Sequence, residues 1–384
     1  MEPFSSRPSP KLIFGPGSLR ELAGCVREAG GSRVFLVSDP GLLKAGHTER
    51  ALRLLGDAGL PATLFAAAKE NPTESDAAAC ADAARAGSFD CVVALGGGSS
   101  LDTAKAGNFL LSNGGRMRDY HGYGKASRPL LPMIAIPTSA GTGSECQSYA
   151  LISRDDTHEK MACGDPKARP YAAILDPELT ASLPQAVAVL SGLDALTHAI
   201  ESAVCTKRNP LSSLYAEAAF RHLALAIGRV IENRASESDR GHMLLGAALA
   251  GLAIENSMLG AAHASANPLT ARHGVVHGQA VALMLPAVLR FNARVPAAAA
   301  VYAHFESILG QLGEAPGLSL VEWVESLEAR SRLPRLDAQG MDFALLAEDA
   351  LRQWTGRFNP RPLQAEDFVA LYQDALASPV SPVK

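Results

Sequence analysis

Residues 90–106, DCVVALGGGSSLDTAKA, place an apolar run, three glycines and a helical pattern in immediate succession. An apolar run of this kind is typical of a strand in a parallel sheet that is covered on both faces. The glycines allow the backbone to approach a ligand, and the N-terminus of a helix that begins near Ser99 favours negative charge. The segment is neither a G-x-G-x-x-G fingerprint nor a P-loop. We interpret it as a phosphate-binding turn, with a tight turn capped by Ser99 as the alternative.

The rest of the chain divides into two kinds of sequence. Up to about Leu183, short apolar runs alternate with alanine-rich helical patterns, which predicts a mostly parallel, Rossmann-like sheet with helices on both faces. The predicted strands are residues 33–38, 62–65, 91–95 and 133–136. Beyond Leu183 long helical patterns take over. Because 384 residues are long for a single core, we predict an α/β domain over residues 1–182 and an all-helical domain over residues 183–384.

Composition argues against several classes of function. The formal net charge of −4 and the short basic clusters make nucleic acid an unexpected partner. The N-terminus lacks a basic segment followed by an apolar run, and no uninterrupted apolar stretch reaches the roughly 18 residues that span a bilayer. We therefore expect no membrane partner. The same two features predict a cytoplasmic location. The six cysteines include no C-x-x-C pair, which favours reduced thiols.

A second polar loop, IPTSAGTGSE at residues 136–145, follows another predicted strand. Its two glycines and four hydroxyl groups would lie at the carboxyl end of a parallel strand, where open α/β sheets bind ligands. A connecting loop with a serine cap is the alternative. Asp39 ends the strand at residues 33–38, where a carboxylate suits ribose hydroxyls and repels a 2′-phosphate. This predicts NAD rather than NADP, with a plain turn residue before Pro40 as the alternative.

Asp194 and His198 lie four residues apart in SGLDALTHAIESAV, so both project from one side of a helix whose sequence is typical of a buried element. On their own they could form a buried hydrogen bond between carboxylate and imidazole. His263 and His277, set among alanine, glycine and valine, are two further imidazoles that need partners. Three imidazoles and one carboxylate suit Fe²⁺ or Zn²⁺ and leave room for a substrate oxygen.

These segments resemble the iron-containing (group III, metal-dependent) alcohol dehydrogenase family along nearly the whole chain. The matching segments are KLIFGPGSLREL at 11–22, ENPT at 70–73, GGGSSLDTAKA at 96–106, IPTSAGTGSE at 136–145, ILDPELT at 174–180, GLDALTHAIE at 192–201 and HGQAVALMLP at 277–286. The resemblance implies the dehydroquinate synthase-like fold, in which a dinucleotide-binding α/β domain precedes an all-helical domain. It also implies reversible hydride transfer between a small or medium alcohol or aldehyde and NAD, with the metal polarising the substrate oxygen.

The functional residues of that family fall on matching side chains of this sequence. The resemblance places the metal ligands at Asp194, His198, His263 and His277. It places the cofactor contacts at Asp39, Asn71, Gly97, Gly98, Ser99, Asp102, Thr138, Ser139, Thr142, Ser144 and Lys160. The expected cofactors are NAD and Fe²⁺, with Zn²⁺ as the alternative metal, and we expect a homodimer or higher homo-oligomer.

One departure from the family pattern concerns proton transfer. Many relatives carry a second histidine four residues after the third ligand, where this sequence has Asn267. Because an amide does not exchange protons in this role, His273 becomes a candidate proton shuttle, beside a cofactor ribose hydroxyl or ordered water.

Two other interpretations of the sequence stay open. One is a reductase or polyol enzyme of the same superfamily, similar to maleylacetate reductase or to the zinc-dependent glycerol dehydrogenases. The other is a metal- and nucleotide-binding protein without turnover.

Overall fold

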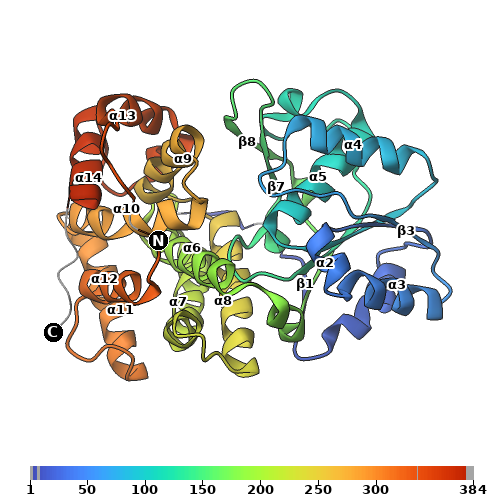
Figure 1. Cartoon of the computed structure of the whole chain (residues 1–384), viewed down its shortest axis with the longest axis horizontal. Coiled ribbons are helices and arrows are strands. Elements are labelled where there is room, and N and C mark those ends of the chain that lie inside the picture. The colour runs from blue at the N-terminus through green and yellow to red at the C-terminus, as the bar shows by residue number, and fades with distance from the viewer. Residues whose placement is uncertain (1–2, 7–8, 335, 378–384) are drawn as a thin grey trace. The chain divides into compact units, whose positions relative to one another are not determined.

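The computed structural model of the chain describes residues 3–6, 9–334 and 336–377. These residues form two compact units, one over residues 9–183 and one over residues 184–377 together with residues 3–6. The first unit combines helices with a parallel sheet, and the second is helical (Figure 1). The predicted fold class is thereby confirmed.

The main sheet of the α/β unit consists of parallel strands in the order β1-β9-β6-β4-β2-β3. These strands are β1 (Lys11–Phe14), β2 (Val34–Val37), β3 (Ala62–Phe65), β4 (Cys91–Gly96), β6 (Met133–Pro137) and β9 (Ala172–Leu175). Every residue of β2, β4, β6 and β9 is buried, as expected of central strands covered on both faces. The four strands predicted from the sequence correspond to β2, β3, β4 and β6. The sequence analysis did not predict β1 and β9.

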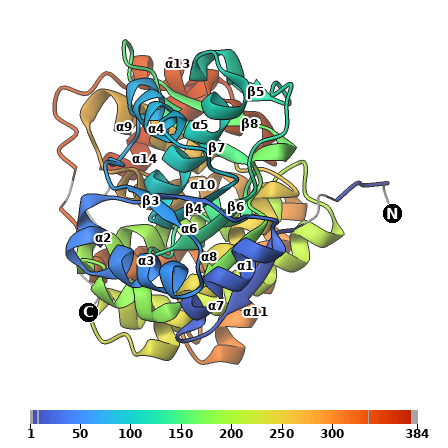
Figure 2. The ribbon, with the colours of Figure 1, turned by 90° about the vertical axis from the view of Figure 1, so that its right-hand side faces the viewer.

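Helices cover both faces of this sheet, as Figure 2 shows. α1 and α3 pack on one face through Leu22, Val26 and Leu55, and α4 and α5 pack on the other through Cys80 and Leu101. The helices of this unit are α1 (Leu22–Glu28), α2 (Pro40–Lys44), α3 (His47–Asp57), α4 (Glu74–Arg85) and α5 (Gly98–Asn113). Because α5 follows β4 directly, the glycines of the predicted phosphate-binding turn lie at its N-terminus.

A small second sheet stands beside the main one in the α/β unit. Its strands are β5 (Gly122–Tyr123), β8 (Lys160–Gly164) and β7 (Tyr149–Ser153), in the order β5-β8-β7. β7 and β8 form an antiparallel hairpin, and buried Ile152 and Met161 join a core with Phe109 of α5. The sequence analysis did not predict this sheet, although β7 and β8 are as long as β6.

The helical unit is built around α6. Its helices are α6 (Gln185–Val204), α7 (Pro210–Ile231), α8 (Glu237–Glu255), α9 (Ala261–His273), α10 (His277–Asn292), α11 (Pro296–Leu312), α12 (Leu320–Ser331), α13 (Phe343–Arg352) and α14 (Ala365–Ala377). All residues of α6 from Gly192 onward are buried. A Cβ atom at Gly192 would lie 2.7 Å from side-chain atoms of both Ile227 and Met243, so α6 passes close to α7 and α8 at this glycine.

α6 is also the one described helix that is long and apolar enough to cross a membrane. Of its most apolar window, 78% is buried inside the protein, and the helix carries Asp194 and His198 on its buried face. These features are those of a core helix.

Asp176 links the ends of β1 and β9, the neighbouring strands at one edge of the main sheet. It follows β9, is fully buried and accepts hydrogen bonds from the peptide N–H groups of Gly17 at 3.0 Å, Leu19 at 3.0 Å and Glu178 at 3.1 Å. Both carboxylate oxygens are used, so the turn after β1 and the turn after β9 depend on one side chain.

We expect Asp176→Asn to lower the free energy of unfolding by about 2 kcal/mol, because the amide keeps one acceptor oxygen and turns an N–H₂ group toward a buried peptide N–H. Urea unfolding followed by circular dichroism measures the change. The matched control is Asp57→Asn, at the exposed end of α3, which we expect to stay within about 0.5 kcal/mol of the wild type. Equal losses in the two variants would contradict the assignment.

Candidate functional site

Two of the predicted metal ligands come from one face of α6. Asp194 and His198 are four residues apart on this helix, so their side chains are neighbours, and His198 Nε2 lies 3.5 Å from Asp194 Oδ1. Both side chains are almost fully buried, at 6% and 7% exposure. α6 therefore holds a carboxylate and an imidazole on its buried face.

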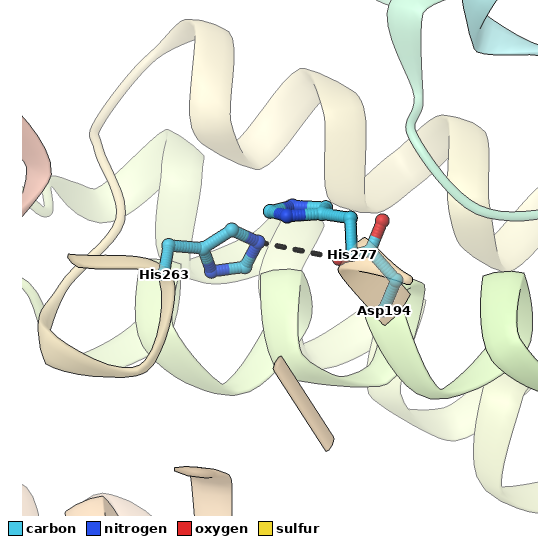
Figure 3. A group of neighbouring side chains, drawn as sticks. All are labelled: Asp194, His263 and His277. Carbon is cyan, nitrogen blue, oxygen red and sulfur yellow. Dashed lines mark hydrogen bonds and ion pairs between the residues drawn. The ribbon is translucent and has the colours of Figure 1, made fainter. Parts of the chain in front are cut away.

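The other two predicted ligands come from α10, which packs beside α6, and from the first turn of α9. His263 lies in the first turn of α9 and His277 is the first residue of α10. Figure 3 shows the imidazole of His263 turned toward Asp194 and the ring of His277 beside them, and His263 Nε2 lies 3.3 Å from Asp194 Oδ1. The ring of His198 stacks on that of His263, with the two ring centroids 4.7 Å apart. The structure thus brings all four predicted ligands into one cluster.

The spacing of three of these side chains is close to what one metal ion requires. One ligand atom each from Asp194, His263 and His277 lie within 4.8 Å of one another. Atoms that share an ion at about 2.0–2.2 Å are at most about 4.4 Å apart, so small side-chain movements would suffice. The donors, one carboxylate and imidazole nitrogens, are those that Fe²⁺ and Zn²⁺ accept.

The electrostatics of the cluster favour positive charge at its centre. Burial alone would lower the pKa of His263, but its hydrogen bonds to Asp194 and Glu201 raise that pKa to about 9. Burial opposes the charged form of Asp194 as well, yet the charge of His198 and the hydrogen bond from His263 hold the pKa of Asp194 well below its usual range. A divalent cation therefore fits this donor set, provided that it displaces the proton from His263.

Glu201 is a member of the cluster that the sequence analysis missed. It follows His198 by three residues on the same face of α6 and is 3% exposed. Its Oε2 lies 2.6 Å from His263 Nδ1, and its Oε1 accepts a hydrogen bond from the peptide N–H of Ala262 at 2.7 Å. The spacing of three residues after His198, and seven after Asp194, was the available signal.

The remaining residues predicted for proton transfer lie further along α9. Asn267 is one turn after His263, and its Nδ2 donates a hydrogen bond to Gln353 Oε1 at 3.0 Å. His273 is exposed in the last turn of the helix, before Gly274 ends it in the left-handed conformation. Its role as a proton shuttle stays a prediction.

In the α/β unit, the two loops predicted to hold the cofactor lie against each other. An added Cβ at Gly98 would come within 2.5 Å of Thr142 Cγ2, and one at Gly97 within 3.3 Å of Ser139 Oγ. Glycine at these positions therefore lets the loop after β6 lie close to the start of α5. The first residue of that loop is Thr138.

Asp39 lies at the carboxyl end of β2 and caps α2. Its Oδ1 accepts hydrogen bonds from the N–H groups of Gly41 at 2.9 Å and Leu42 at 3.1 Å, and its Oδ2 accepts one from Ser100 Oγ at 2.9 Å. The turn role considered for Asp39 is thus present, and the same contacts fix its carboxylate beside the glycine turn. Its contact with a ribose stays a prediction.

Asn71, Ser99 and Lys160 form a second group near that turn. Asn71 takes the left-handed conformation, with φ of 51°, and its N–H donates to Ser99 Oγ at 3.2 Å. Lys160 Nζ donates to Asn71 Oδ1 at 3.4 Å. Three residues predicted to contact the cofactor, from segments far apart in the sequence, therefore lie together.

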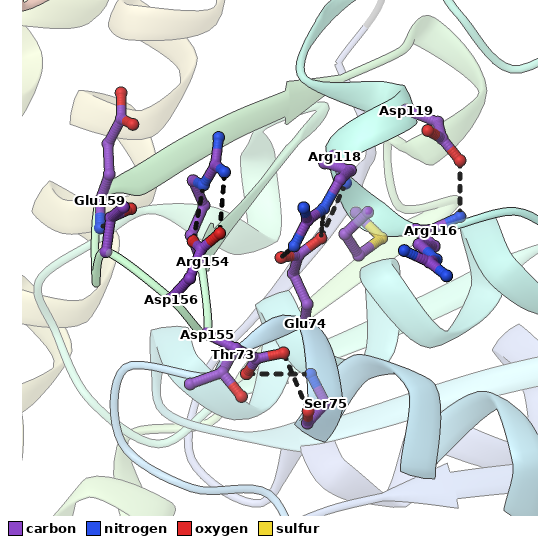
Figure 4. A network of polar contacts seen from close by, with 12 residues as sticks. Thr73, Glu74, Ser75, Arg116, Arg118, Asp119, Arg154, Asp155, Asp156 and Glu159 are labelled. Carbon is purple, nitrogen blue, oxygen red and sulfur yellow. Dashed lines mark hydrogen bonds and ion pairs between the residues drawn. The ribbon is translucent and has the colours of Figure 1, made fainter.

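A network of polar contacts holds the hairpin that carries Lys160 (Figure 4). The hairpin residue Asp155 accepts hydrogen bonds from the N–H and hydroxyl groups of Ser75, at the start of α4. Next to Ser75, the buried side chain of Glu74 forms an ion pair with Arg118. The β7–β8 hairpin is therefore fixed to the N-terminus of α4.

Asp102 and Ser144 are engaged with each other inside the unit. Asp102 Oδ1 accepts a hydrogen bond from Ser144 Oγ at 2.7 Å, and its Oδ2 accepts one from the N–H of Leu151 at 3.2 Å. Lys105, 1% exposed, donates to Ser144 O at 2.6 Å, Ser144 Oγ at 2.8 Å and Tyr149 O at 2.9 Å. These contacts join α5 to the loop after β6, a role that the sequence analysis did not predict for Asp102 or Lys105.

We expect Lys105→Met to lower the free energy of unfolding by about 3 kcal/mol or more, because it leaves the buried carboxylate of Asp102 and two peptide carbonyls without their cation. Chemical unfolding of the variant measures the loss. Lys44→Met, at the exposed end of α2, removes the same charge from the surface and serves as the control. A loss no larger than that of the control would contradict a structural role for Lys105.

Comparisons with known proteins cover both units of the chain. The model of a family described as iron-containing alcohol dehydrogenase matches residues 9–177, and the model of the C-terminal part of the Fe-containing alcohol dehydrogenase family matches residues 188–376. Alcohol dehydrogenase 4 of Schizosaccharomyces pombe is 32% identical over 367 residues, covering 95% of this chain and 87% of the relative.

Two solved structures extend the likeness to the fold. The crystal structure of a 1,3-propanediol oxidoreductase superposes with a TM-score of 0.89 at 28% identity, covering 97% of this chain and 100% of that one. Sulfoacetaldehyde reductase from Bifidobacterium kashiwanohense, solved in complex with NAD⁺, superposes with a TM-score of 0.84 at 25% identity, covering 98% and 100% of the two chains.

Proposed function

The chain belongs to the iron-containing alcohol dehydrogenase family, and we propose that it transfers hydride reversibly between a small or medium alcohol or aldehyde and NAD, with a divalent metal at Asp194, His198, His263 and His277. Membership of this family makes it an oxidoreductase that acts on alcohols. The observation that carries the proposal is the convergence of Asp194, His263 and His277 within 4.8 Å in a buried cluster.

The residues of the helical unit would hold the metal and prepare the reaction. When bound, Fe²⁺ or Zn²⁺ supplies a Lewis acid that polarises the substrate oxygen. Asp194 contributes the anionic ligand, and the imidazoles must be neutral to bind the ion. Because Asn267 cannot exchange a proton, the proposal assigns proton transfer to His273, to a cofactor ribose hydroxyl or to water.

The residues of the α/β unit would bind the cofactor. The N–H groups at the start of α5, with Gly97, Gly98 and Ser99, suit the pyrophosphate, because the end of the helix favours negative charge. Asp39 suits the adenosine ribose, and Lys160 is held beside Asn71 for the second ribose. Asp102, Thr138, Ser139, Thr142 and Ser144 complete the proposed cofactor set. A relative solved with NAD⁺ supports this choice of cofactor.

We also propose a cytoplasmic location and a homodimer or higher homo-oligomer. A cytoplasmic location is supported by the cysteines, all six of which are free and buried. The proposed homodimer or higher homo-oligomer can be measured by light scattering.

A second candidate function lies in the same family. The likeness to a sulfoacetaldehyde reductase favours testing carbonyl reduction, and the proposed Zn²⁺ alternative favours testing polyols such as glycerol. A panel of short alcohols, glycerol and aldehydes, assayed in both directions with metal-loaded protein, would identify the substrate class.

We expect His263→Ala to lose its bound metal and to lower alcohol-dependent NADH formation by roughly 10³-fold, since Lewis-acid stabilisation is worth several kcal/mol. Metal content is measured on protein purified without oxygen. The control is His121→Ala, because His121 is exposed and is not a predicted ligand. Full activity of the wild type after removal of its metal would contradict the proposed mechanism.

We expect Asp39→Asn to raise the ratio of kcat/KM for NADP to that for NAD by about tenfold, which corresponds to about 1.4 kcal/mol. Asparagine caps a helix as well as aspartate does, so the change removes charge and leaves the cap of α2 in place. Asp57→Asn is the control for charge alone. A wild type that already prefers NADP would show that Asp39 does not select the cofactor.

A further inference from the structure

The first turn of α9 is capped by side chains from elsewhere in the helical unit. The residue before the helix, Gly260, has no side chain to cap it, yet the N–H of Ala261 donates to Asn359 Oδ1 at 3.2 Å and that of Ala262 donates to Glu201 Oε1 at 2.7 Å. A Cβ at Gly260 would lie 3.0 Å from both acceptor oxygens. The glycine therefore makes room for two remote caps, which satisfy N–H groups that the helix itself cannot.

The second oxygen of Glu201 acts on the side chain of the same turn. Glu201 Oε2 lies 2.6 Å from His263 Nδ1, and the opposite ring nitrogen, Nε2, lies 3.3 Å from Asp194 Oδ1. A carboxylate accepts hydrogen bonds and donates none, so this contact keeps the proton of a neutral His263 on Nδ1. Nε2 then carries the lone pair, on the side of the ring that faces Asp194.

The negative charge of Glu201 also affects the balance of charge in the buried cluster. Its side chain is 3% exposed, and the partners that the structure gives it are an imidazole and a peptide N–H. Burying an ion in such surroundings is costly unless an opposite charge is near. A divalent cation bound by Asp194 and neutral imidazoles would leave one positive charge uncompensated, and Glu201 would bring the formal sum to zero.

We propose that Glu201 is a positioning residue of the metal centre, which locks His263 in the metal-binding tautomer and supplies the second negative charge that balances a buried dication. This inference rests on the proposed metal site. Contacts of this kind tune metal affinity, and their loss typically costs about 10–100-fold in binding.

Glu201→Gln is the variant that separates charge from shape. Glutamine keeps the size of the side chain and can still accept the Ala262 N–H, but its N–H₂ group, turned toward His263, favours the tautomer with the proton on Nε2. We expect the folded metal-free variant to bind Zn²⁺ about 10–100-fold more weakly than the wild type, measured by competition with a chromogenic chelator.

A second readout reports on the tautomer itself. In metal-free protein at high pH, the ¹⁵N shifts of the His263 ring should show the proton on Nδ1 in the wild type and a shift toward Nε2 in Glu201→Gln. The matched control is Asn359→Ala, which removes the other remote cap and leaves the His263 contact in place. It should lower the melting temperature without weakening Zn²⁺ binding or moving the ¹⁵N shifts.

The outcomes separate the inference from the proposed function. If the wild type binds Zn²⁺ and His263→Ala abolishes binding while Glu201→Gln binds as tightly as the wild type, the positioning role is wrong and the metal site stands. If Glu201→Gln and Asn359→Ala weaken binding equally, Glu201 acts as a cap alone, and the inference is overturned. A wild type without Zn²⁺ or Fe²⁺ affinity would overturn the proposed function itself.

Discussion

The buried negative charge on α6 is the constraint on which the helical unit depends. Asp194 and Glu201 point from one face of a helix whose surroundings are otherwise apolar, and their neighbours are imidazoles and a peptide N–H. Carboxylates in such a place must be paired with positive charge or with several hydrogen-bond donors. The first turn of α9, together with the start of α10, which packs beside α6, supplies these partners.

In the α/β unit the buried charge is positive and belongs to Lys105. Here the cation, Lys105, lies in the middle of α5 and binds the loop after β6 through Ser144, while Asp102 balances its charge. The glycine turn at the start of α5 can then meet that loop closely, because Gly98 leaves space for Thr142.

Much of the fold followed from local pattern. The central strands are apolar at every position and α5 follows β4 without a linker, so the parallel sheet and its glycine turn could be predicted. The cluster around Asp194 could be predicted in part, since residue type and spacing single out Asp194 and His198. The pairing of Glu201 with His263 could not, because it depends on how α6 packs against α9, 62 residues further along the chain. The hairpin of β7 and β8 was missed for a similar reason, since it depends on contacts with segments distant in the sequence, namely the packing of Ile152 and Met161 with Phe109 and the bond of Asp155 to Ser75.

The polar side chains along α9 differ in how firmly their surroundings hold them. Its first turn is held by Glu201 and Asn359 and carries His263, so the orientation of this imidazole is determined from outside the helix. One turn later Asn267 is tied to Gln353 by a neutral amide pair, which holds no titratable proton. The last turn is exposed and carries His273. The groups along one helix thus pass from a buried imidazole held by remote side chains, through a bonded amide pair, to an exposed imidazole.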